Sequence, residues 1–159
     1  MEAFEIITSA LHSLSKQSTA DWVFVQQVMP HINAVTKHIP PRDLAQCITE
    51  ISGRAWMLGD VLSRHGRYKQ AMELYERALA GYEEALGVDH PDTLGTVNNM
   101  ALVFGHQGQH EKALELYERA LVGYEKALGV DHVDALPTVS NMAFIFKKQG
   151  QYGKALESV

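Results

Sequence analysis

The sequence predicts an all-α fold in which antiparallel helix pairs stack along the chain, and three observations support this prediction. A unit of 42 residues occurs twice in succession, at 66–107 and 108–149, with 27 identical positions. Apolar residues within each unit recur three and four positions apart, as on one face of a helix. A helix pair with one apolar face cannot bury that face alone, so successive units must stack on one another.

Each unit is predicted to contain two helices joined at a glycine. Gly108 ends one first helix, because glycine readily adopts the left-handed backbone conformation that closes many helices. The linker GVDHPDTL follows the second helix, and its Pro91 fits the first turn of the next helix. The pattern places helices at 47–65, 68–86, 93–107 and 110–128.

The first 46 residues do not follow the repeat and are predicted to form a separate helical segment. Helices are expected from about 3 to 14 and from about 22 to 38. Pro30 should divide the second of these helices, and the proline pair at 40–41 should end it, because proline disrupts a helix interior.

The last unit, at about 135–159, stops before its second helix is complete. Apolar surface around Phe146, Tyr152 and Leu156 is therefore expected to remain uncovered. We expect this terminus to fray or to cause self-association.

Small and large residues alternate along the units in a pattern that resembles the tetratricopeptide repeat (TPR) family. In that family small residues lie where paired helices touch, and large residues fill the gaps; His110 stands where an aromatic residue is usual. The resemblance covers about residues 47–159, and the residues that carry it are Leu58, Gly59, Leu62, Gly66, Tyr68, Ala71, Tyr75 and Ala78, then Met100, Ala101, Phe104, Gly108, Ala113, Tyr117 and Ala120, then Met142, Ala143, Phe146, Gly150, Tyr152 and Ala155.

The resemblance implies a TPR α-solenoid, in which antiparallel helix pairs form a right-handed superhelix. It divides the chain into a helical segment at 1–46 and a repeat array at 47–159. The expected units of that array are about 52–92, 93–134 and 135–159.

The unit is longer than the standard TPR unit of about 34 residues. The extra residues, YEEALGVDHPDT at 82–93, are predicted to extend the second helix. Units of this length resemble the repeats of kinesin light chains. They also resemble the repeats of fungal and bacterial NLR-like proteins, to which LYERALAGYEEALGVDHPDTLGTVNNMALVF is most similar. Trp22, Met29, Pro30 and His31 resemble the helical stretch that precedes the repeats in NLR-like proteins.

Composition and charge argue against several classes of partner. The net charge of −5 does not favour nucleic acid or an anionic membrane surface. No apolar run approaches the roughly 20 residues needed to cross a bilayer. Cys47 is the only cysteine, so an internal disulfide is impossible, and a cytoplasmic location is expected.

Side chains that could carry chemistry all have a structural interpretation. His90 and His132 occupy the same position in successive linkers, so each is predicted to hydrogen-bond its own linker rather than to share a metal ion. Glutamates of the second helices pair with arginine one turn later, as in Glu115–Arg119, and indicate a solvated face. No glycine-rich nucleotide motif occurs. We expect no catalytic activity, cofactor, nucleotide or metal. The tyrosines at the repeat period, predicted to pack between helices, are Tyr75, Tyr82, Tyr117 and Tyr124.

By resemblance, the first helix of each unit lines a concave groove that binds a peptide. Asn99 and Asn141 match the asparagine with which TPR proteins hold a peptide backbone, whereas Met57 stands there in the first unit. An amide both donates and accepts hydrogen bonds, so a bond between units is an equally open interpretation. The predicted groove residues are Trp56, Asp60, Arg64, Asn98, Asn99, Leu102, His106, Asn141, Phe144 and Lys148.

The lysines with which chaperone-binding TPR proteins hold a terminal carboxylate would fall at Gly53, Gly95 and Pro137. Binding of a chaperone C-terminus is therefore not expected. The leading prediction is a module or scaffold that binds a protein or peptide, as the sensor or scaffold region of an NLR-like protein. A kinesin light chain-like cargo adaptor and a purely structural spacer are the alternatives, and an enzyme is the rival class.

Overall fold

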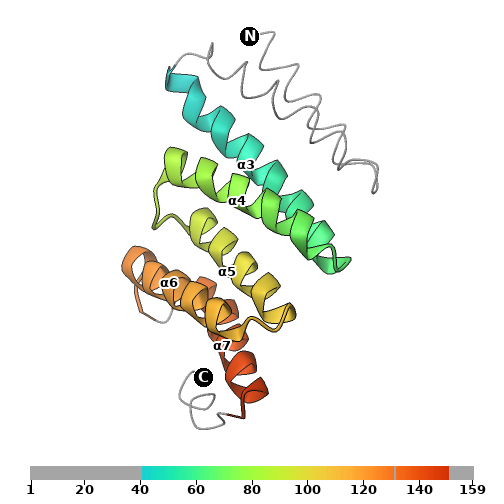
Figure 1. The fold of residues 1–159 in the computed structure, drawn as a ribbon. Helices are drawn as coiled ribbons and strands as arrows, with labels where there is room; N and C mark the ends of the chain where they lie inside the picture. The colour runs from blue at the N-terminus through green and yellow to red at the C-terminus, as the bar shows by residue number, and fades with distance from the viewer. Residues whose placement is uncertain (1–40, 131, 151–159) are drawn as a thin grey trace.

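The structure, a computed structural model, describes residues 41–130 and 132–150. Within these ranges every regular element is helical and none is a strand, as the repeat predicted. Consecutive helices pack on one another in chain order, from α3 at one end of the stack to α7 at the other (Figure 1). The elements are α3 (Pro41–Arg64), α4 (Tyr68–Leu86), α5 (Pro91–His106), α6 (His110–Leu128), the 3-10 helix η1 (Val133–Ala135) and α7 (Leu136–Lys148).

Most predicted helix bounds are confirmed, but the start of α3 is not. α4 and α6 span the predicted 68–86 and 110–128, and α5 begins at Pro91 rather than at residue 93. The predicted start of α3 at residue 47 is wrong, because the helix begins at Pro41. Proline is favoured at the first position of a helix, where its missing N–H would have no partner anyway. The helices expected at 3–14 and 22–38, Tyr152 and Leu156 lie outside the described residues.

The predicted extension of the second helix through residue 93 is also wrong in part. α4 ends at Leu86, and the residues from Gly87 to His90 form the linker to the next unit. Pro91 to Thr93 then form the first turn of α5. The additional length of the unit is therefore shared between the end of one helix, a linker and the start of the next helix.

The turn within each unit closes the first helix in the same way each time. Gly66 has φ +73°, and its N–H donates to the Ser63 carbonyl at 2.9 Å while the Arg67 N–H donates to the Leu62 carbonyl at 2.9 Å. Gly108 repeats this arrangement at φ +75°. The pair of bonds is the Schellman motif, which satisfies carbonyls left free at a helix end.

The linker between units is closed by two side-chain hydrogen bonds. His90 Nδ1 accepts from the Asp92 N–H at 3.2 Å, so a histidine caps the N-terminus of α5. The Thr93 hydroxyl donates to the Gly87 carbonyl at 2.8 Å. His132 repeats the cap with the Asp134 N–H at 3.2 Å. The predicted hydrogen bond of each histidine to its own linker is confirmed.

The third unit starts differently from the second. Val133 and Pro137 replace Pro91 and Gly95, and the short helix η1 precedes α7. The ring of a proline clashes with the carbonyl four residues earlier, which here belongs to Val133. An α-helix through Pro137 therefore cannot extend back to Val133, and α7 begins at Leu136 instead.

The helices pack through the positions that carry the TPR pattern. Tyr75 and Tyr117 are almost fully buried, each inside a separate core cluster between helices. Phe146, expected to lie on an uncovered surface, is half-buried and packs against the cluster of Tyr117. The alanines at which second helices approach their neighbours have no exposed surface; they are Ala71, Ala78, Ala113 and Ala120.

Contacts between units join the second helices by charge. Arg119 was predicted to pair with Glu115 one turn earlier, but its guanidinium instead donates to Glu83 of the preceding second helix at 2.5 Å. The Lys126 ammonium group donates to the carboxylate of Asp89 in the preceding linker. The side chains of Arg119 and Lys126 therefore extend across the boundary between units, and their charges contribute to the stacking of the units.

Gly123 provides a test of how closely the two helices of one unit, α5 and α6, approach. A methyl group at Gly123 would clash with the Leu94 side chain, which is 1% exposed and has no room to move. Gly123→Ala should therefore lower stability by about 1–3 kcal/mol, despite a helix-propensity gain of about 1 kcal/mol. At Gly95 a methyl group would lie 3.6 Å from the Tyr124 hydroxyl, an ordinary contact. Gly95→Ala should be neutral or stabilising, and urea unfolding followed by circular dichroism compares the two. Equal midpoints for both variants would contradict this packing.

Candidate functional site

The first helices of successive units adjoin along one side of the stack. α3 contacts α5, and α5 contacts α7, in addition to the contacts of α3 with α4 and of α5 with α6. These helices carry all ten predicted groove residues. The structure therefore brings the three predicted groups onto neighbouring helices, and the surroundings of each group differ.

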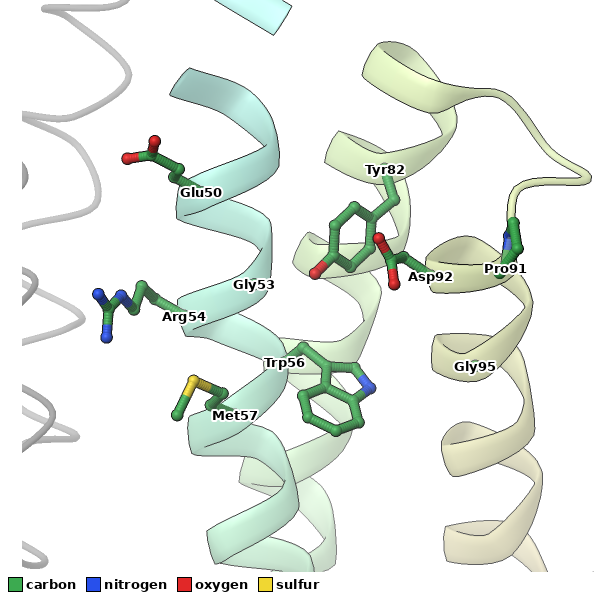
Figure 2. A pocket seen from close by; sticks show the side chains of 9 residues that line it. All are labelled: Glu50, Gly53, Arg54, Trp56, Met57, Tyr82, Pro91, Asp92 and Gly95. Carbon is green, nitrogen blue, oxygen red and sulfur yellow. The ribbon is translucent and has the colours of Figure 1, made fainter. Parts of the chain in front are cut away.

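A cleft of about 400 Å³ lies between α3 and the start of α5. Figure 2 shows the side chains around it: Trp56 from α3, Tyr82 from α4 and Asp92 from α5 occupy the gap between the helices, while Glu50, Arg54 and Met57 extend from α3 away from that gap. The residues that line the cleft are Glu50, Gly53, Arg54, Trp56, Met57, Tyr82, Pro91, Asp92 and Gly95.

Two glycines keep the cleft open. Gly53 and Gly95 occupy the same position in the first helices of successive units, and both line the cleft. A methyl group at Gly53 would lie only 3.2 Å from the Tyr82 hydroxyl. Any larger residue would fill the space above the tyrosine. Gly53 and Gly95 occupy positions where a carboxylate clamp would have lysines. Because glycine has no side chain, the cleft is open at these two positions.

Tyr82 forms the floor of the cleft. The residue is only 7% exposed, yet its hydroxyl reaches the space beside Gly53. Burial, followed by the negative charge of Asp92, raises the pKa of the Tyr82 hydroxyl above its ordinary value. The phenol therefore remains protonated at neutral pH and can both donate and accept a hydrogen bond.

The predicted groove residues of α3 have two different environments. Trp56 is half-buried and packs against the core cluster around Tyr75 while its ring faces the cleft. Asp60 and Arg64 form an ion pair of 2.7 Å one helical turn apart, beyond the lining of the cleft. Such a pair leaves little net charge for a ligand at that end of the helix.

The asparagines of α5 are half-buried between helices, and one of them is engaged between units. Burial raises the pKa of the Tyr75 hydroxyl above its ordinary value, and the side chains of Asn99 and Ser63 partly offset this rise. The interpretation of Asn99 as a contact between units is therefore favoured. The Oδ1 atom of Asn98 is buried and has no hydrogen-bond partner among the described residues. Asn98 therefore retains the capacity to bind a donor.

The remaining predicted residues lie further along the first helices. The exposed His106 ring stacks on Tyr68 with 5.8 Å between ring centroids, and Leu102 is half-buried. On α7, Phe144 is 55% exposed, and the Lys148 ammonium group lies 5.4 Å from the centre of its ring. Asn141 is half-buried on the same helix. The ten predicted residues thus share one side of the stack, but only Trp56 lines the cleft.

Sequence reasoning missed most of the cleft. Tyr82 was assigned to packing alone, and Asp92 and Arg54 were not selected. The available signal was a glycine at the same position in two successive first helices, where the lack of a side chain on both leaves room for a gap.

Within 41–130 and 132–150, no three histidine, cysteine, aspartate or glutamate side chains gather as a metal site would require. None of the helices in these ranges combines the length and apolar character that crossing a bilayer demands.

Comparison with known families identifies the repeat. The tetratricopeptide repeat family matches residues 52–121 and 92–159, which together span more than half of the chain. An NLR-like protein with nucleotide-binding and leucine-rich repeat character from Hyaloscypha variabilis is 46% identical over 41 residues. That match covers 26% of this chain and 4% of the relative, so the chain corresponds to a small part of that protein's length.

Solved structures share the fold at low sequence identity. BtubC (BKLC) from P. vanneervenii aligns over 98% of this chain and 70% of its own, with a TM-score of 0.61 and 17% identity. A kinesin light chain from Podosopora anserina with nearly identical TPR-like repeats aligns over 84% of this chain and 71% of its own, with a TM-score of 0.57 and 18% identity. The α-solenoid fold and the resemblance to both groups of repeat proteins are confirmed.

The interaction of Asn99 with the Tyr75 hydroxyl predicts that equivalent asparagines differ in their effect on stability. Asn99→Ala removes a partner of a buried hydroxyl and should lower the free energy of unfolding by about 1 kcal/mol, with Ser63 limiting the loss. Asn141→Ala is the matched control, because the pKa of its neighbouring tyrosine, Tyr117, is raised by burial without an asparagine contribution. Urea titrations of both variants measure the difference. A larger loss for Asn141→Ala would contradict the assignment.

Proposed function

Since the chain belongs to the tetratricopeptide repeat family, we propose that it is a protein-interaction module that holds an extended segment of a partner along the first helices of its units. TPR repeats generally mediate contacts between proteins. The observation that carries the proposal is the cleft between α3 and α5, in which an indole, a phenol and a carboxylate face an open space. Ligand-binding sites combine concave shape, aromatic surface and a few polar groups in this manner.

The side chains along the first helices suit a peptide in extended conformation. Met57 is 50% exposed beside the cleft, and Phe144 offers a second apolar surface on α7. Between them, the buried Oδ1 of Asn98 lacks a donor among the described residues, and a peptide N–H could supply one. Apolar anchors combined with backbone hydrogen bonds are the usual basis of peptide recognition.

The second helices are less suited to this role. Their tyrosines are buried, and Arg119 and Lys126 bind acidic groups of the preceding unit. Because these side chains already bind other parts of the array, the second helices offer few free polar groups to a partner. The proposed binding surface therefore lies on the first helices, with Trp56 as its central residue.

We further propose that this array is the sensor or scaffold region of a cytoplasmic NLR-like protein. The 46% identity over 41 residues supports this assignment over a kinesin light chain-like cargo adaptor, because likeness at 17–18% identity reflects the fold alone. The proposed division remains a helical segment at 1–46 and an array at 47–159. TPR proteins are typically non-enzymatic scaffolds, and we propose the same for this chain, without cofactor or metal.

Site-specific photo-crosslinking tests the proposed surface. A benzophenone amino acid at Met57, which is half-exposed beside the cleft, should capture a partner in native cells. The same amino acid at Glu76, which is exposed on α4 of the same unit, is the matched control and should capture little. With the captured partner in hand, Met57→Asp should weaken its binding at least about 10-fold, or about 1.4 kcal/mol, by placing a charge in an apolar contact. Equal capture from both positions, or capture from Glu76 alone, would place the interface elsewhere.

A further inference from the structure

Within the groove proposed above, we infer that the cleft between α3 and α5 is a pocket for a cationic side chain, arginine or lysine, of the partner segment. This inference rests on the proposed function and adds the chemistry of the residue that occupies the pocket. Three features carry it: a carboxylate without a lysine or arginine partner among the described residues, two aromatic rings and a hydroxyl that faces the cleft.

The carboxylate of Asp92 faces the gap, and its side chain is 57% exposed. It lies 3.7 Å from His90 Nδ1, but that nitrogen accepts a hydrogen bond from the Asp92 backbone N–H and so carries a lone pair rather than a proton. Among the described residues Asp92 has no lysine or arginine partner. Figure 2 shows Arg54, the one basic residue of the lining, extending away from the gap, on the same side of α3 as Glu50.

The aromatic walls favour a cation over a neutral polar group. The Trp56 ring and the Tyr82 ring both lie in the gap that Asp92 faces (Figure 2). The face of an indole or phenol ring attracts ammonium and guanidinium groups, and tryptophan does so most strongly. Aliphatic stems of lysine and arginine also pack well on such surfaces.

The hydroxyl of Tyr82 completes the pocket. The residue as a whole is 7% exposed, and its hydroxyl faces the cleft beside Gly53. An N–H donor from a ligand in the cleft could hydrogen-bond this oxygen. Ammonium and guanidinium groups have donors and no acceptors, which matches a carboxylate and a hydroxyl together.

Other occupants fit less well. An apolar side chain would bury the Asp92 carboxylate and the Tyr82 hydroxyl without compensation. An acidic side chain would face Asp92, with Glu50 at the rim of the same cleft. A cationic side chain is the class that suits the three groups in the gap, Asp92, Trp56 and Tyr82, while Arg54 extends away from it.

The next gap along the array lacks this combination, which provides an internal control. Asn98 stands where Trp56 stands in the first gap, and Pro137 replaces Gly95. The hydroxyl of Tyr124, equivalent to Tyr82, already donates to the Pro91 carbonyl at 3.5 Å. Asp134, equivalent to Asp92, thus lies in a gap with neither the aromatic wall nor the free hydroxyl.

The test is an NMR titration of the full chain with the pentapeptide acetyl-Ala-Ala-Arg-Ala-Ala-amide and with its lysine, citrulline and glutamate versions at the central position. The arginine or lysine peptide should shift the Trp56 indole N–H and the Gly53 and Gly95 amide resonances in a saturable manner. Citrulline retains the shape of arginine without its charge and should bind at least tenfold more weakly, as should glutamate. Comparison of arginine with lysine shows which cation the pocket prefers.

Variants separate the pocket from general electrostatic attraction. Asp92→Asn should reduce affinity for the cationic peptide at least tenfold, whereas Asp134→Asn should change it less than twofold. Tyr82→Phe, which retains the ring, should reduce affinity severalfold. Equal binding of citrulline and arginine, equal effects of Asp92→Asn and Asp134→Asn, or no saturable shift at Trp56 would overturn the inference.

Failure of the pocket and failure of the groove give different results. Partner capture at Met57 together with no response to cationic peptides retains the groove and overturns the pocket. A selective response to cationic peptides without partner capture at Met57 retains the pocket chemistry and overturns the proposed interaction surface.

Discussion

The close approach of helices at alanine is the constraint from which the rest of the structure follows. Ala71 and Ala78 on α4, and Ala113 and Ala120 on α6, have no exposed surface, and a larger residue at any of them would push two helices apart. Interiors are packed so densely that added volume must be accommodated by movement of the backbone. These short side chains set the spacing of each pair, and Tyr75 and Tyr117 fill the room that remains. The spacing then fixes where the first helices stand and how wide the gap between them is.

The helices could be predicted from the sequence because the spacing of apolar residues and glycines recurs in successive units. Glycines at equal intervals located the turns, and the bounds of α4 and α6 followed. The start of α3 was harder, because Pro41 reads as the end of one element and serves as the beginning of another. Arg119 was also harder, since a pattern within one helix cannot show that a carboxylate of the preceding unit lies within reach.

The site was less predictable than the fold for a physical reason. A cleft forms where side chains are missing, whereas sequence reasoning selects residues for the functional groups that their side chains carry. Gly53 and Gly95 were noted for the lysines they lack, yet the consequence of their lack of any side chain depends on how near the two helices lie. Asn99 shows the opposite problem. Its amide chemistry suited a ligand and a neighbouring unit equally well, and only the position of the Tyr75 hydroxyl distinguishes them.

The linker has a property that concerns the growth of such proteins. Its two closing hydrogen bonds, His90 to the Asp92 N–H and Thr93 to the Gly87 carbonyl, begin and end within seven consecutive residues, 87–93. The conformation of this linker is therefore specified locally, while the packing of neighbouring units and the Arg119–Glu83 and Lys126–Asp89 pairs hold the units together. Duplication of a 42-residue segment copies the residues that close the linker, and the histidine cap recurs at His132 even though the following helix begins differently. Replacements confined to the first helices, such as Trp56 by Asn98, can then alter recognition in one gap while the joints remain unchanged.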